Sequence, residues 1–426
     1  MGPARLGLSE NLAQFSLLVA VNAFVGAMVG LERSTLPLIG EDDFGLTSSA
    51  AVLSFIVAFG IAKSLTNLAA GVGAERVGRR HLLIAGWLVA LPVPVLIAVA
   101  PSWSWIVAAN VLLGVNQGLA WSMTVVMKID LVGPKRRGFA LGLNEAAGYG
   151  GVAVAAALSG WLAAELAPRD VLVVAGAAIA LIALLLSAAF VRDTAGHVAV
   201  EQEGGDHDRD EVAPGLRRAF ADVSFRRPAL RACSQAGLVN NLNDALVWGL
   251  VPLFLAANGA SAAEVGLVAG IYPGVWGIGQ IFAGQWSDRI GRKPLIVGGM
   301  LLQALALAVL AISDGAIAPA AVAAVILGVG TALVYPTLIA AISDAVSPVA
   351  RAPAVGAYRF WRDMGYVAGG LLAGTAADAV GFGGAIAIVA ALTAASGVWV
   401  AIDLAESPRR PGLPDRVDRI WQTRAP

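Results

Sequence analysis

Twelve apolar blocks of about 20 residues each, separated by short charged or proline- and glycine-bearing segments, restrict what this chain can fold into. A helix of that length crosses the roughly 30 Å hydrocarbon core of a bilayer at about 1.5 Å per residue. In lipid, an open chain can satisfy its own backbone polar groups only as a helix. We therefore predict an all-α integral membrane protein. The expected spans are residues 14–37, 46–70, 81–100, 103–128, 138–163, 171–191, 232–257, 263–285, 294–313, 317–342, 353–376 and 381–402.

Charge and cysteine content exclude several classes of partner. The 426 residues include 29 basic and 29 acidic side chains, so the net charge is zero and no nucleic-acid partner is expected. Cys233 is the single cysteine, which excludes an internal disulfide. The sequence shows no zinc-ligand spacing, no nucleophile–base pair and no Walker-type nucleotide loop. We expect no metal, no cofactor and no enzymatic activity, and a lipid bilayer around the spans.

The basic residues are unevenly distributed between the loops. If both termini are cytoplasmic, the tails and inward loops hold 23 of the 29 Lys and Arg, and the outward side holds only Arg33 and Arg169. The first outward loop, residues 38–45, is acidic instead. This positive-inside bias predicts a multi-pass protein of the plasma membrane, the inner membrane in a bacterium, with both termini in the cytoplasm. Glu32 and Arg33, near the outer end of the first span, are equally compatible with an outer-mouth pair and with a binding feature.

A long polar connector divides the spans into two groups of six. We expect a six-helix bundle over residues 1–191, a cytoplasmic connector over 192–231, a second six-helix bundle over 232–403 and a cytoplasmic tail over 404–426. The acidic middle of the connector is typical of a solvated linker. Its last part, GLRRAFADVSFRRPALR, is predicted to form a short basic amphipathic helix on the inner leaflet.

The two groups of spans repeat the same residues. The stretches GVGAERVGRRHL (71–82) and GQWSDRIGRKPL (284–295) lie 213 positions apart. A nearly constant offset in several separate regions indicates an internal duplication, and duplicated halves with a site between them are a recurring plan of transporters. Other matched pairs, at offsets of 213 to 215, are Phe59 with Tyr272, Gly114 with Gly328, Asp130 with Asp344 and Pro37 with Pro252.

The doubled loop motif resembles the hallmark of a known family, the major facilitator superfamily (MFS). The resemblance covers nearly the whole chain, and it implies the MFS fold of two pseudo-symmetric six-helix bundles with twelve transmembrane helices. It also implies a gating role for residues of the motif, and the alternative is that its arginines only fix the topology. On this resemblance Glu75 and Asp288 face a helix end of the other half, Arg79 pairs with Asp130, and Arg292 pairs with Asp344.

Polar residues follow one face of the fourth and seventh spans. The resemblance places these two spans beside the central cavity, and a polar stripe on an apolar membrane helix faces a cavity or another helix. Asp244 is therefore a candidate proton or cation site, and the alternative is a buried structural pair. The stripes consist of Asn110, Gln117, Trp121, Thr124 and Lys128, and of Asn240, Asp244 and Trp248 with Asn243 beside them.

Three further spans carry charges at depth, each of which costs at least about 2.5 kcal/mol without a partner or water. These charges are Lys63, Glu145, Arg359, Arg362 and Asp363. The resemblance implies that spans two and eleven meet, as do spans five and eight. We therefore expect a Lys63–Asp363 pair across the halves, which leaves Glu145 for substrate or proton. Alternatively, all of these residues form ion pairs that hold the inward mouth closed.

Aromatic residues and the glycines of span five give information about the class of solute and the type of transport. Aromatic walls suit flat or apolar solutes and organic cations. Span five partly matches the antiporter signature of the family, but Ala146 and Ala147 stand at its central Gly-Pro pair, and Gly114 replaces an arginine often found in span four. The aromatic residues on or near the predicted cavity faces are Trp121, Trp248, Tyr272, Trp276, Tyr335 and Trp361.

Taken together, these features predict a monomeric secondary active transporter that moves a small organic solute by alternating access. We expect coupling to protons through Asp244, Glu145 or both, and we favour efflux slightly. The first alternative is a proton-coupled uptake permease for an organic anion bound by Lys63, Arg359 and Arg362. A non-transporting membrane sensor or scaffold is the second, and the connector and tail are short and polar for such a role.

Overall fold

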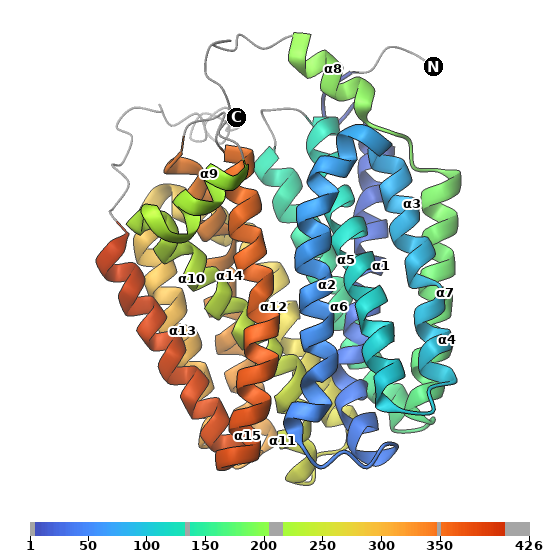
Figure 1. The fold of residues 1–426 in the computed structure, drawn as a ribbon, viewed down its shortest axis with the longest axis vertical. Coiled ribbons are helices and arrows are strands. Elements are labelled where there is room, and N and C mark those ends of the chain that lie inside the picture. The colour runs from blue at the N-terminus through green and yellow to red at the C-terminus, as the bar shows by residue number, and fades with distance from the viewer. Residues whose placement is uncertain (1–4, 133–136, 204–215, 347–350, 405–426) are drawn as a thin grey trace, which may run out of the picture.

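The computed structural model describes residues 5–132, 137–203, 216–346 and 351–404, and these residues form helices joined by short loops, with no strand among them (Figure 1). We call α1 to α7 the first half and α10 to α15 the second half, and η2 and η3 are π-helical turns. The elements are α1 (Leu12–Asp42), α2 (Ser49–Val77), α3 (Arg79–Ala90), α4 (Pro92–Ala98), α5 (Trp103–Val132), α6 (Arg137–Ala163), α7 (Pro168–Ala189), α8 (Ala195–Glu203), α9 (Leu216–Ala221), η2 (Asp222–Arg226), α10 (Pro228–Ala245), η3 (Leu246–Leu250), α11 (Val251–Ala257), α12 (Ala262–Ile290), α13 (Arg292–Ala311), α14 (Ile317–Asp344) and α15 (Arg351–Asp403).

Within the described ranges, eleven segments are long and apolar enough to cross a bilayer, and the last of them is a double crossing. α15 bends at Gly381, whose φ of 78° lies in the left-handed region that glycine adopts at little cost. Its two arms run in opposite directions in Figure 1 and correspond to the predicted spans 353–376 and 381–402. α3 with α4, and α10 with η3 and α11, each form one interrupted span. The predicted all-helical membrane fold is confirmed.

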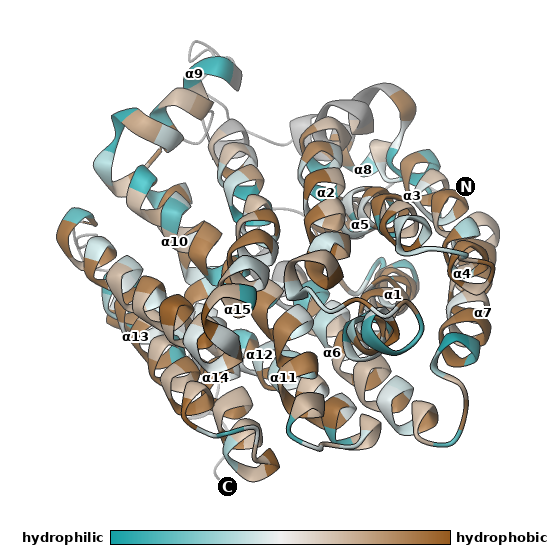
Figure 2. Ribbon diagram, turned by 60° about the horizontal axis from the view of Figure 1, so that its bottom comes forward, coloured by the Kyte–Doolittle hydropathy of each residue, from teal (hydrophilic) through white to brown (hydrophobic). Residues whose placement is uncertain are grey.

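The helices differ in how much of their surface faces outward. The most apolar window of α7 has a mean hydropathy of 2.8 and is 33% buried, whereas the span Pro228–Ala257 has a mean hydropathy of 1.3 and is 89% buried. Large apolar side chains such as Val174 and Leu185 of α7 are exposed. In the ribbon of Figure 2, apolar residues (brown) recur along the outer helices. An apolar exterior around a more polar interior suits a protein solvated by lipid.

The internal duplication is also present in the structure. Gly78 and Gly291 end α2 and α12 with φ of 91° and 105°, so the chain turns at the same position of both loop motifs. The next helix then begins at Arg79 in the first half and at Arg292 in the second. The repeated glycines are therefore required by the turn between two helices.

A second matched pair fixes how closely two helices approach in each half. A Cβ added at Gly114 of α5 would lie 2.6 Å from the backbone oxygen of Phe59 in α2. A Cβ added at Gly328 of α14 would lie 2.8 Å from the backbone oxygen of Tyr272 in α12. Phe59 and Tyr272 are themselves matched by the repeat. The arginine that the resemblance leads one to expect at position 114 has no room unless α2 moves away from α5.

The two halves pack along two helix pairs, α6 with α12 and α2 with α15. A Cβ on Gly160 of α6 would lie 2.5 Å from the Cα of Gly266 in α12. A Cβ on Gly60 of α2 would lie 2.8 Å from the Cβ of Tyr366 in α15. Small residues thus bring the backbones of the two halves into direct contact, as is common between membrane helices. The predicted meeting of spans five and eight, and of spans two and eleven, is confirmed.

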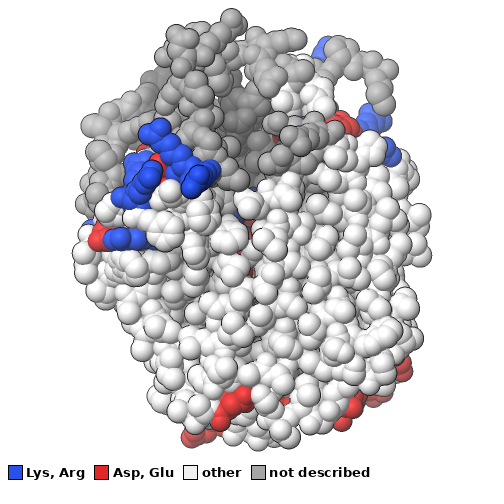
Figure 3. All heavy atoms as spheres, in the orientation of Figure 1, with Lys and Arg blue, Asp and Glu red and all other residues white. Residues whose placement is uncertain are grey.

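Exposed charges gather at opposite ends of the bundle (Figure 3). The basic end carries α9 and η2, and the acidic end carries the loops after α1, α6 and α11 and the bend of α15 (Figures 1 and 3). This polarity follows the uneven distribution of charge seen in the sequence. Exposed residues at the basic end include Arg217, Arg218, Arg226 and Arg227, and exposed residues at the acidic end include Asp42, Asp43, Glu165, Asp170, Glu264 and Asp378.

α9 and η2 occupy the place of the predicted amphipathic helix. Phe220 of α9 stacks on Trp361 of α15 with ring centroids 5.9 Å apart, and the Trp361 indole donates a hydrogen bond of 2.8 Å to Ser224. Trp361 therefore packs under α9 at the basic end, and the prediction that it lines the central cavity is wrong. Most of the predicted acidic linker (204–215) and of the tail (405–426) lies outside the described residues.

Gly114→Ala and Gly328→Ala should each destabilise the protein by about 1–3 kcal/mol, because the added methyl group meets backbone that must shift. Thermal unfolding of the purified protein in detergent would measure the loss. Gly142→Ala is the matched control, because a Cβ there meets nothing within 4 Å. If both variants unfold at the wild-type temperature, the helix pairs are not held as closely as described.

Candidate functional site

At the basic end, both loop motifs form the ion pairs that the resemblance implies. Arg79 Nε lies 2.9 Å from Asp130 Oδ2, and Arg292 Nε lies 3.0 Å from Asp344 Oδ2. Each pair joins the start of one helix to the end of another within the same half. The two predicted pairings are confirmed, and their role in gating stays a prediction. The side chains of Glu75 and Asp288, which are predicted to face the other half, lie outside the described part of the chain.

Glu145 of α6 lies in a buried hydrogen-bond network between the halves. Its Oε1 accepts hydrogen bonds from the indole N–H of Trp121 at 3.0 Å and from the side-chain amide of Asn144 at 3.1 Å. Its Oε2 accepts a longer bond of 3.4 Å from the hydroxyl of Tyr335 on α14. Since α6 and α14 belong to different halves, this carboxylate links the halves directly.

Arg362 and Asp363 continue the network along α15. Arg362 donates to the Tyr335 hydroxyl and, at 2.5 and 2.9 Å, to one oxygen of Asp363. Asn67 of α2 donates to the other Asp363 oxygen at 2.6 Å, which is a second direct bond between the halves. The predicted Lys63–Asp363 ion pair is wrong, because Arg362 and Asn67 already occupy this carboxylate.

Lys63 lies among aromatic rings instead, and no described acid comes within 4 Å of its ammonium group. Its Nζ lies 5.4 Å from the ring centroid of Phe59, 5.5 Å from that of Trp121 and 5.2 Å from that of Tyr366. A cation over ring faces is stabilised by their electron density, and more strongly where water is excluded. Because Asn67 follows Lys63 by one helical turn on the same face of α2, it is Asn67 that reaches Asp363.

Four aromatic rings from both halves adjoin Glu145. Tyr149 of α6 contacts Trp276 of α12 with ring centroids 3.5 Å apart, and Trp276 contacts Tyr335 at 5.2 Å. Trp121 of α5 contacts Tyr149 at 5.2 Å. These rings surround a carboxylate with apolar surface, so a solute bound here would contact ring faces as well as charge.

Asp244 of α10 forms a separate acidic group within the second half. Its carboxylate is fully buried and accepts hydrogen bonds from the hydroxyl of Tyr272 on α12 and, at 3.5 Å, from that of Tyr366 on α15. The helix then passes into η3, because Pro252 has no N–H to donate to the carbonyl of Trp248. The π-helical turn places the Trp248 ring on Tyr366, with centroids 5.9 Å apart.

Several predicted site residues lie elsewhere. Asn240 and Asn243 form an amide network with Gln303 of α13 inside the second half, at 3.0 and 2.8 Å. Gln117 donates to the backbone of α1 at 2.8 Å. These amides satisfy polar groups between packed helices, so we do not include them in the candidate site. Arg359 is partly exposed about two turns into α15.

At the acidic end, Asp378 of α15 binds the start of α2 across the halves. Its carboxylate accepts hydrogen bonds from the Ser48 hydroxyl and the Ser49 N–H, each at 2.6 Å, and from the Ala50 N–H at 3.2 Å. A carboxylate at a helix N-terminus satisfies free N–H groups and is favoured by the helix dipole. A Cβ on Gly374 would lie 2.5 Å from the Cα of Ala50, so the two helices touch here.

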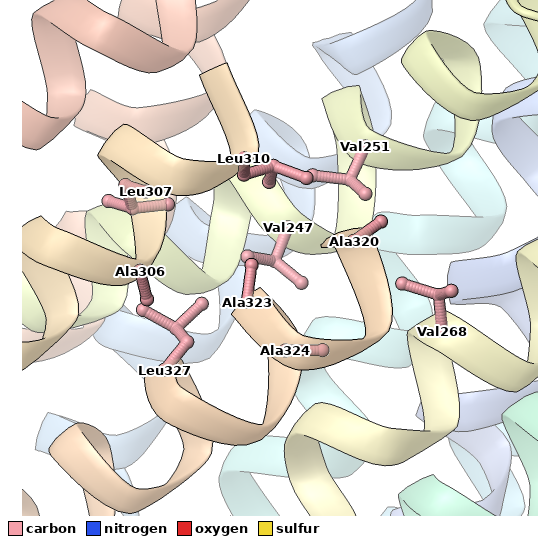
Figure 4. Close-up of a pocket in the computed structure, with 10 residues that line it drawn as sticks. All are labelled: Val247, Val251, Val268, Ala306, Leu307, Leu310, Ala320, Ala323, Ala324 and Leu327. Atoms are coloured by element: carbon pink, nitrogen blue, oxygen red, sulfur yellow. The ribbon is translucent and has the colours of Figure 1, made fainter. Parts of the chain in front are cut away.

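Figure 4 shows a small pocket inside the second half, which none of these charged groups lines. It is lined only by aliphatic side chains, among them Val247, Leu307 and Leu327. A lining without polar groups cannot orient a polar solute, so we place the candidate site between the halves. Among the described residues, no group of three or more His, Cys, Asp or Glu could hold a metal ion.

Comparison with known proteins identifies the family. The model described as Major Facilitator Superfamily matches residues 11–240 and, separately, residues 233–425. The chain is a member of the major facilitator superfamily. A crystal structure of a mutant of the nucleoside transporter NupG shares its fold, with a TM-score of 0.69 over 91% of this chain and 98% of that chain, at 15% sequence identity. The predicted MFS fold is thereby confirmed.

Curated relatives are also transporters by name. The inner membrane transport protein YajR of Escherichia coli is 48% identical over 60 residues, which is 14% of this chain and 13% of that protein. The MFS-type transporter STM4428 of Salmonella typhimurium is 24% identical over 375 residues, 83% of this chain and 87% of that protein. A protein of Cupriavidus pinatubonensis named a probable 4-methylmuconolactone transporter is 26% identical over 260 residues, 60% of this chain and 58% of that protein. All three relatives are thus named as transport proteins, and the family model assigns this chain to the same superfamily as the second of them.

Two residues of the site, Tyr149 and Tyr366, are absent from the sequence-based prediction. The low number of tyrosines could have pointed to them: the chain contains only five. In the structure all five are buried. A buried tyrosine in a membrane protein needs a partner for its hydroxyl. Tyr366 donates to Asp244, and Tyr149 contacts three aromatic residues of the candidate site.

Asp378→Ala should loosen the acidic end, because a lost helix cap is worth about 1–2 kcal/mol, or a 5- to 30-fold change in an opening equilibrium. Leu53→Cys in a Cys233→Ser background gives a buried reporter on α2. We expect a membrane-impermeant maleimide to label it correspondingly faster in the Asp378 variant. Glu165→Ala removes another exposed acid at the same end and is the control. Equal labelling of all three proteins would contradict a closing role for Asp378.

Proposed function

We propose that this protein is a secondary active transporter that moves a small organic solute across the plasma membrane by alternating access, driven by protons. The observation that carries the proposal is the buried network that joins the halves through Glu145, Tyr335 and Arg362. Charged groups inside a membrane protein are costly, and they commonly mark solute or ion pathways. Here they lie between two halves that a duplication has made alike, which is where transporters of this plan bind solute.

The hydrogen bonds between the halves lie at two depths, and alternating access needs contacts that can open separately. In the middle of the bundle, Asn67 contacts Asp363 and Tyr335 contacts Glu145. At the acidic end, Asp378 caps α2. Opening toward the acidic end must break the Asp378 contacts first. These hydrogen bonds at a helix end cost little to break, about the value of a helix cap, and the close contacts of Gly374 with Ala50 and of Gly160 with Gly266 must separate as well.

We infer that the basic end faces the cytoplasm, with both termini on that side. The support is the exposed arginine cluster of α9 and η2 and the acidic side chains at the other end (Figure 3). Asp378 then closes the outward side. We also expect a monomer, because the candidate site lies between the halves of one chain.

Glu145 is the main candidate for proton coupling. The Tyr335 hydroxyl donates to Glu145 and accepts from Arg362, so the charge on Glu145 favours the contact between the halves. A proton on Glu145 removes that charge and weakens the link to α14. Asp244 contacts only residues of the second half, so a proton there would loosen the packing of α10 against α12 and α15.

The direction of transport stays a prediction, with export slightly favoured by the aromatic lining. Uptake of an organic anion is the second candidate. Lys63 favours it, because no described acid lies within 4 Å of this buried cation and three rings surround it. Measuring flux in proteoliposomes with the proton gradient imposed in either direction distinguishes the two.

A disulfide across the acidic end should stop transport. Ala50→Cys with Gly374→Cys, in the Cys233→Ser background, would bring the two Cβ atoms to 3.2 Å, just below the roughly 3.5–4.5 Å of a disulfide. Because a Cβ on Gly374 also lies 2.5 Å from the Cα of Ala50, the two helix ends must move slightly apart to accept the crosslink. We expect oxidation to abolish flux of a solute found by thermal-shift screening, and a reductant to restore it. Each single-cysteine protein is a control. Wild-type flux in the crosslinked protein would exclude alternating access through this end.

Glu145→Gln and Asp244→Asn should each abolish proton-driven flux and leave the protein folded, because an amide keeps the shape of the carboxylate but cannot take up the proton. The measurement is solute accumulation in proteoliposomes under an imposed pH gradient. Exchange of labelled for unlabelled solute without a gradient should continue. Glu264→Gln, at an exposed helix cap on α12, is the control. Normal accumulation by both variants would show that neither carboxylate couples protons to transport.

A further inference from the structure

Arg33 of α1 is a buried cation, and no ion pair or hydrogen bond within the described residues accounts for it. Its side chain is fully buried, and none of its three guanidinium nitrogens finds a hydrogen-bond partner among the described residues. The sequence favours its placement on the outward side, but the structure places it between the halves, on the acidic-end side of Lys63. The adjacent acid, Glu32, lines a gap between α1, α4 and α7 and offers the guanidinium no hydrogen bond. An unpaired buried charge is strongly unfavourable, because it has lost its hydration and gained no partner.

Aromatic rings from both halves surround the guanidinium. Its Cζ lies 5.3 Å from the ring centroid of Phe55, 4.6 Å from that of Phe59 and 5.7 Å from that of Trp248. The indole N–H of Trp248 is also buried without an acceptor in the described part of the chain. Arg33 and Trp248 are separated by 215 positions, the offset that matches Pro37 with Pro252, so they occupy equivalent places in the two halves.

Lys63 belongs to the same cluster. Its ammonium group and the Arg33 guanidinium lie against the same ring, that of Phe59, at 5.4 and 4.6 Å from its centroid. The cluster therefore combines two cations and one indole N–H, and every one of these groups is a donor. Two neighbouring cations repel each other, so a shared anion would relieve both.

Three acids of the interior are already engaged by other donors. Asp244 accepts from Tyr272 and Tyr366, and Asp363 accepts from Arg362 and Asn67. Glu145 accepts from Trp121, Asn144 and Tyr335. Asp244 and Glu32 act on Arg33 electrostatically from a distance and offer its nitrogens no hydrogen bond. Neither these acids nor Glu32, whose Oε2 has no partner among the described residues, hydrogen-bonds to Arg33, so a ligand would supply the acceptor that this cluster lacks.

We propose that Arg33, Lys63 and the Trp248 indole N–H bind the carboxylate of an organic anion, whose hydrocarbon part packs on Phe55 and Phe59. A guanidinium binds a carboxylate through two parallel hydrogen bonds, which no other side chain matches. Because Arg33 and Trp248 come from different halves, the bound carboxylate bridges them. This inference rests on the proposed transport function and specifies the class of solute.

The test is carboxylate binding by the purified full-length protein in detergent. The probes are benzoate, phenylacetate and hexanoate, each with its neutral amide as a matched control, and the measurement is the unfolding temperature as a function of probe concentration. We expect at least one carboxylate, and not its amide, to raise that temperature saturably. Arg33→Gln should weaken its apparent Kd by about 10- to 100-fold, as for a lost hydrogen bond to a charged group. The apparent Kd of the Arg33→Lys variant should lie between that of the wild type and that of Arg33→Gln.

Two further variants separate a loss of binding from a failure to fold and from a general effect of removing an arginine. Trp248→Phe keeps the ring and loses the N–H, so it should weaken binding less than Arg33→Gln and would still report if the arginine variants fail to fold. Arg169→Gln removes an arginine at the acidic end that pairs with Asp43 and should bind like the wild type. The proposal is overturned if no probe carboxylate stabilises the wild type, if the amides act equally, or if the Arg33 and Trp248 variants bind as well as the wild type.

The outcome is separable from that of the transport proposal. The disulfide between positions 50 and 374 tests alternating access with any transported solute. If that crosslink stops flux and the Arg33 variants bind carboxylates normally, only the carboxylate site is wrong. If carboxylate binding needs Arg33 and the crosslink leaves flux unchanged, the site stands and alternating access fails.

Discussion

A charge inside a bilayer needs a partner, and three interior acids find theirs within the protein. Each of three central carboxylates, Glu145, Asp244 and Asp363, accepts hydrogen bonds from tyrosine, tryptophan, asparagine or arginine side chains. Those donors come from different helices, so the need to satisfy three acids also fixes how the helices sit. Where donors of both halves meet one acid, as at Asp363, the same bonds hold the halves together.

The duplication provides a symmetric scaffold that carries an asymmetric site. Gly78 and Gly291 turn the chain alike, and Gly114 and Gly328 set the same close approach of helices. The interior charges do not follow this symmetry: Glu145 corresponds to Arg359 at the offset of 214. Scaffold positions are constrained by backbone contacts that both halves share, whereas a solute that is not symmetric needs different groups on its two sides.

Most of the fold and part of the site could be predicted from the sequence. The loop-motif ion pairs, Arg79 with Asp130 and Arg292 with Asp344, are what the resemblance to the family implies, and the structure contains both. The Lys63–Asp363 pair failed because two competitors, Arg362 and Asn67, lie closer to the carboxylate, and spacing along one helix cannot rank partners on another. The placement of Asn240 and Asn243 in the site was not supported for a related reason. A polar residue on a membrane helix can face a cavity or a neighbouring helix, and the sequence pattern is identical in the two cases.

The sequence by itself determined the class of fold, because runs of apolar residues long enough to cross lipid must become helices, and the doubled motif showed that the helices form two similar halves. It also determined the polarity of charge between the ends. Only the tertiary structure decided which charges meet in the interior, since a difference of one helical turn exchanges Asn67 for Lys63 at Asp363. It also decided that Arg33 lies buried beside Trp248 rather than at an outer mouth, because that position depends on how one half packs against the other.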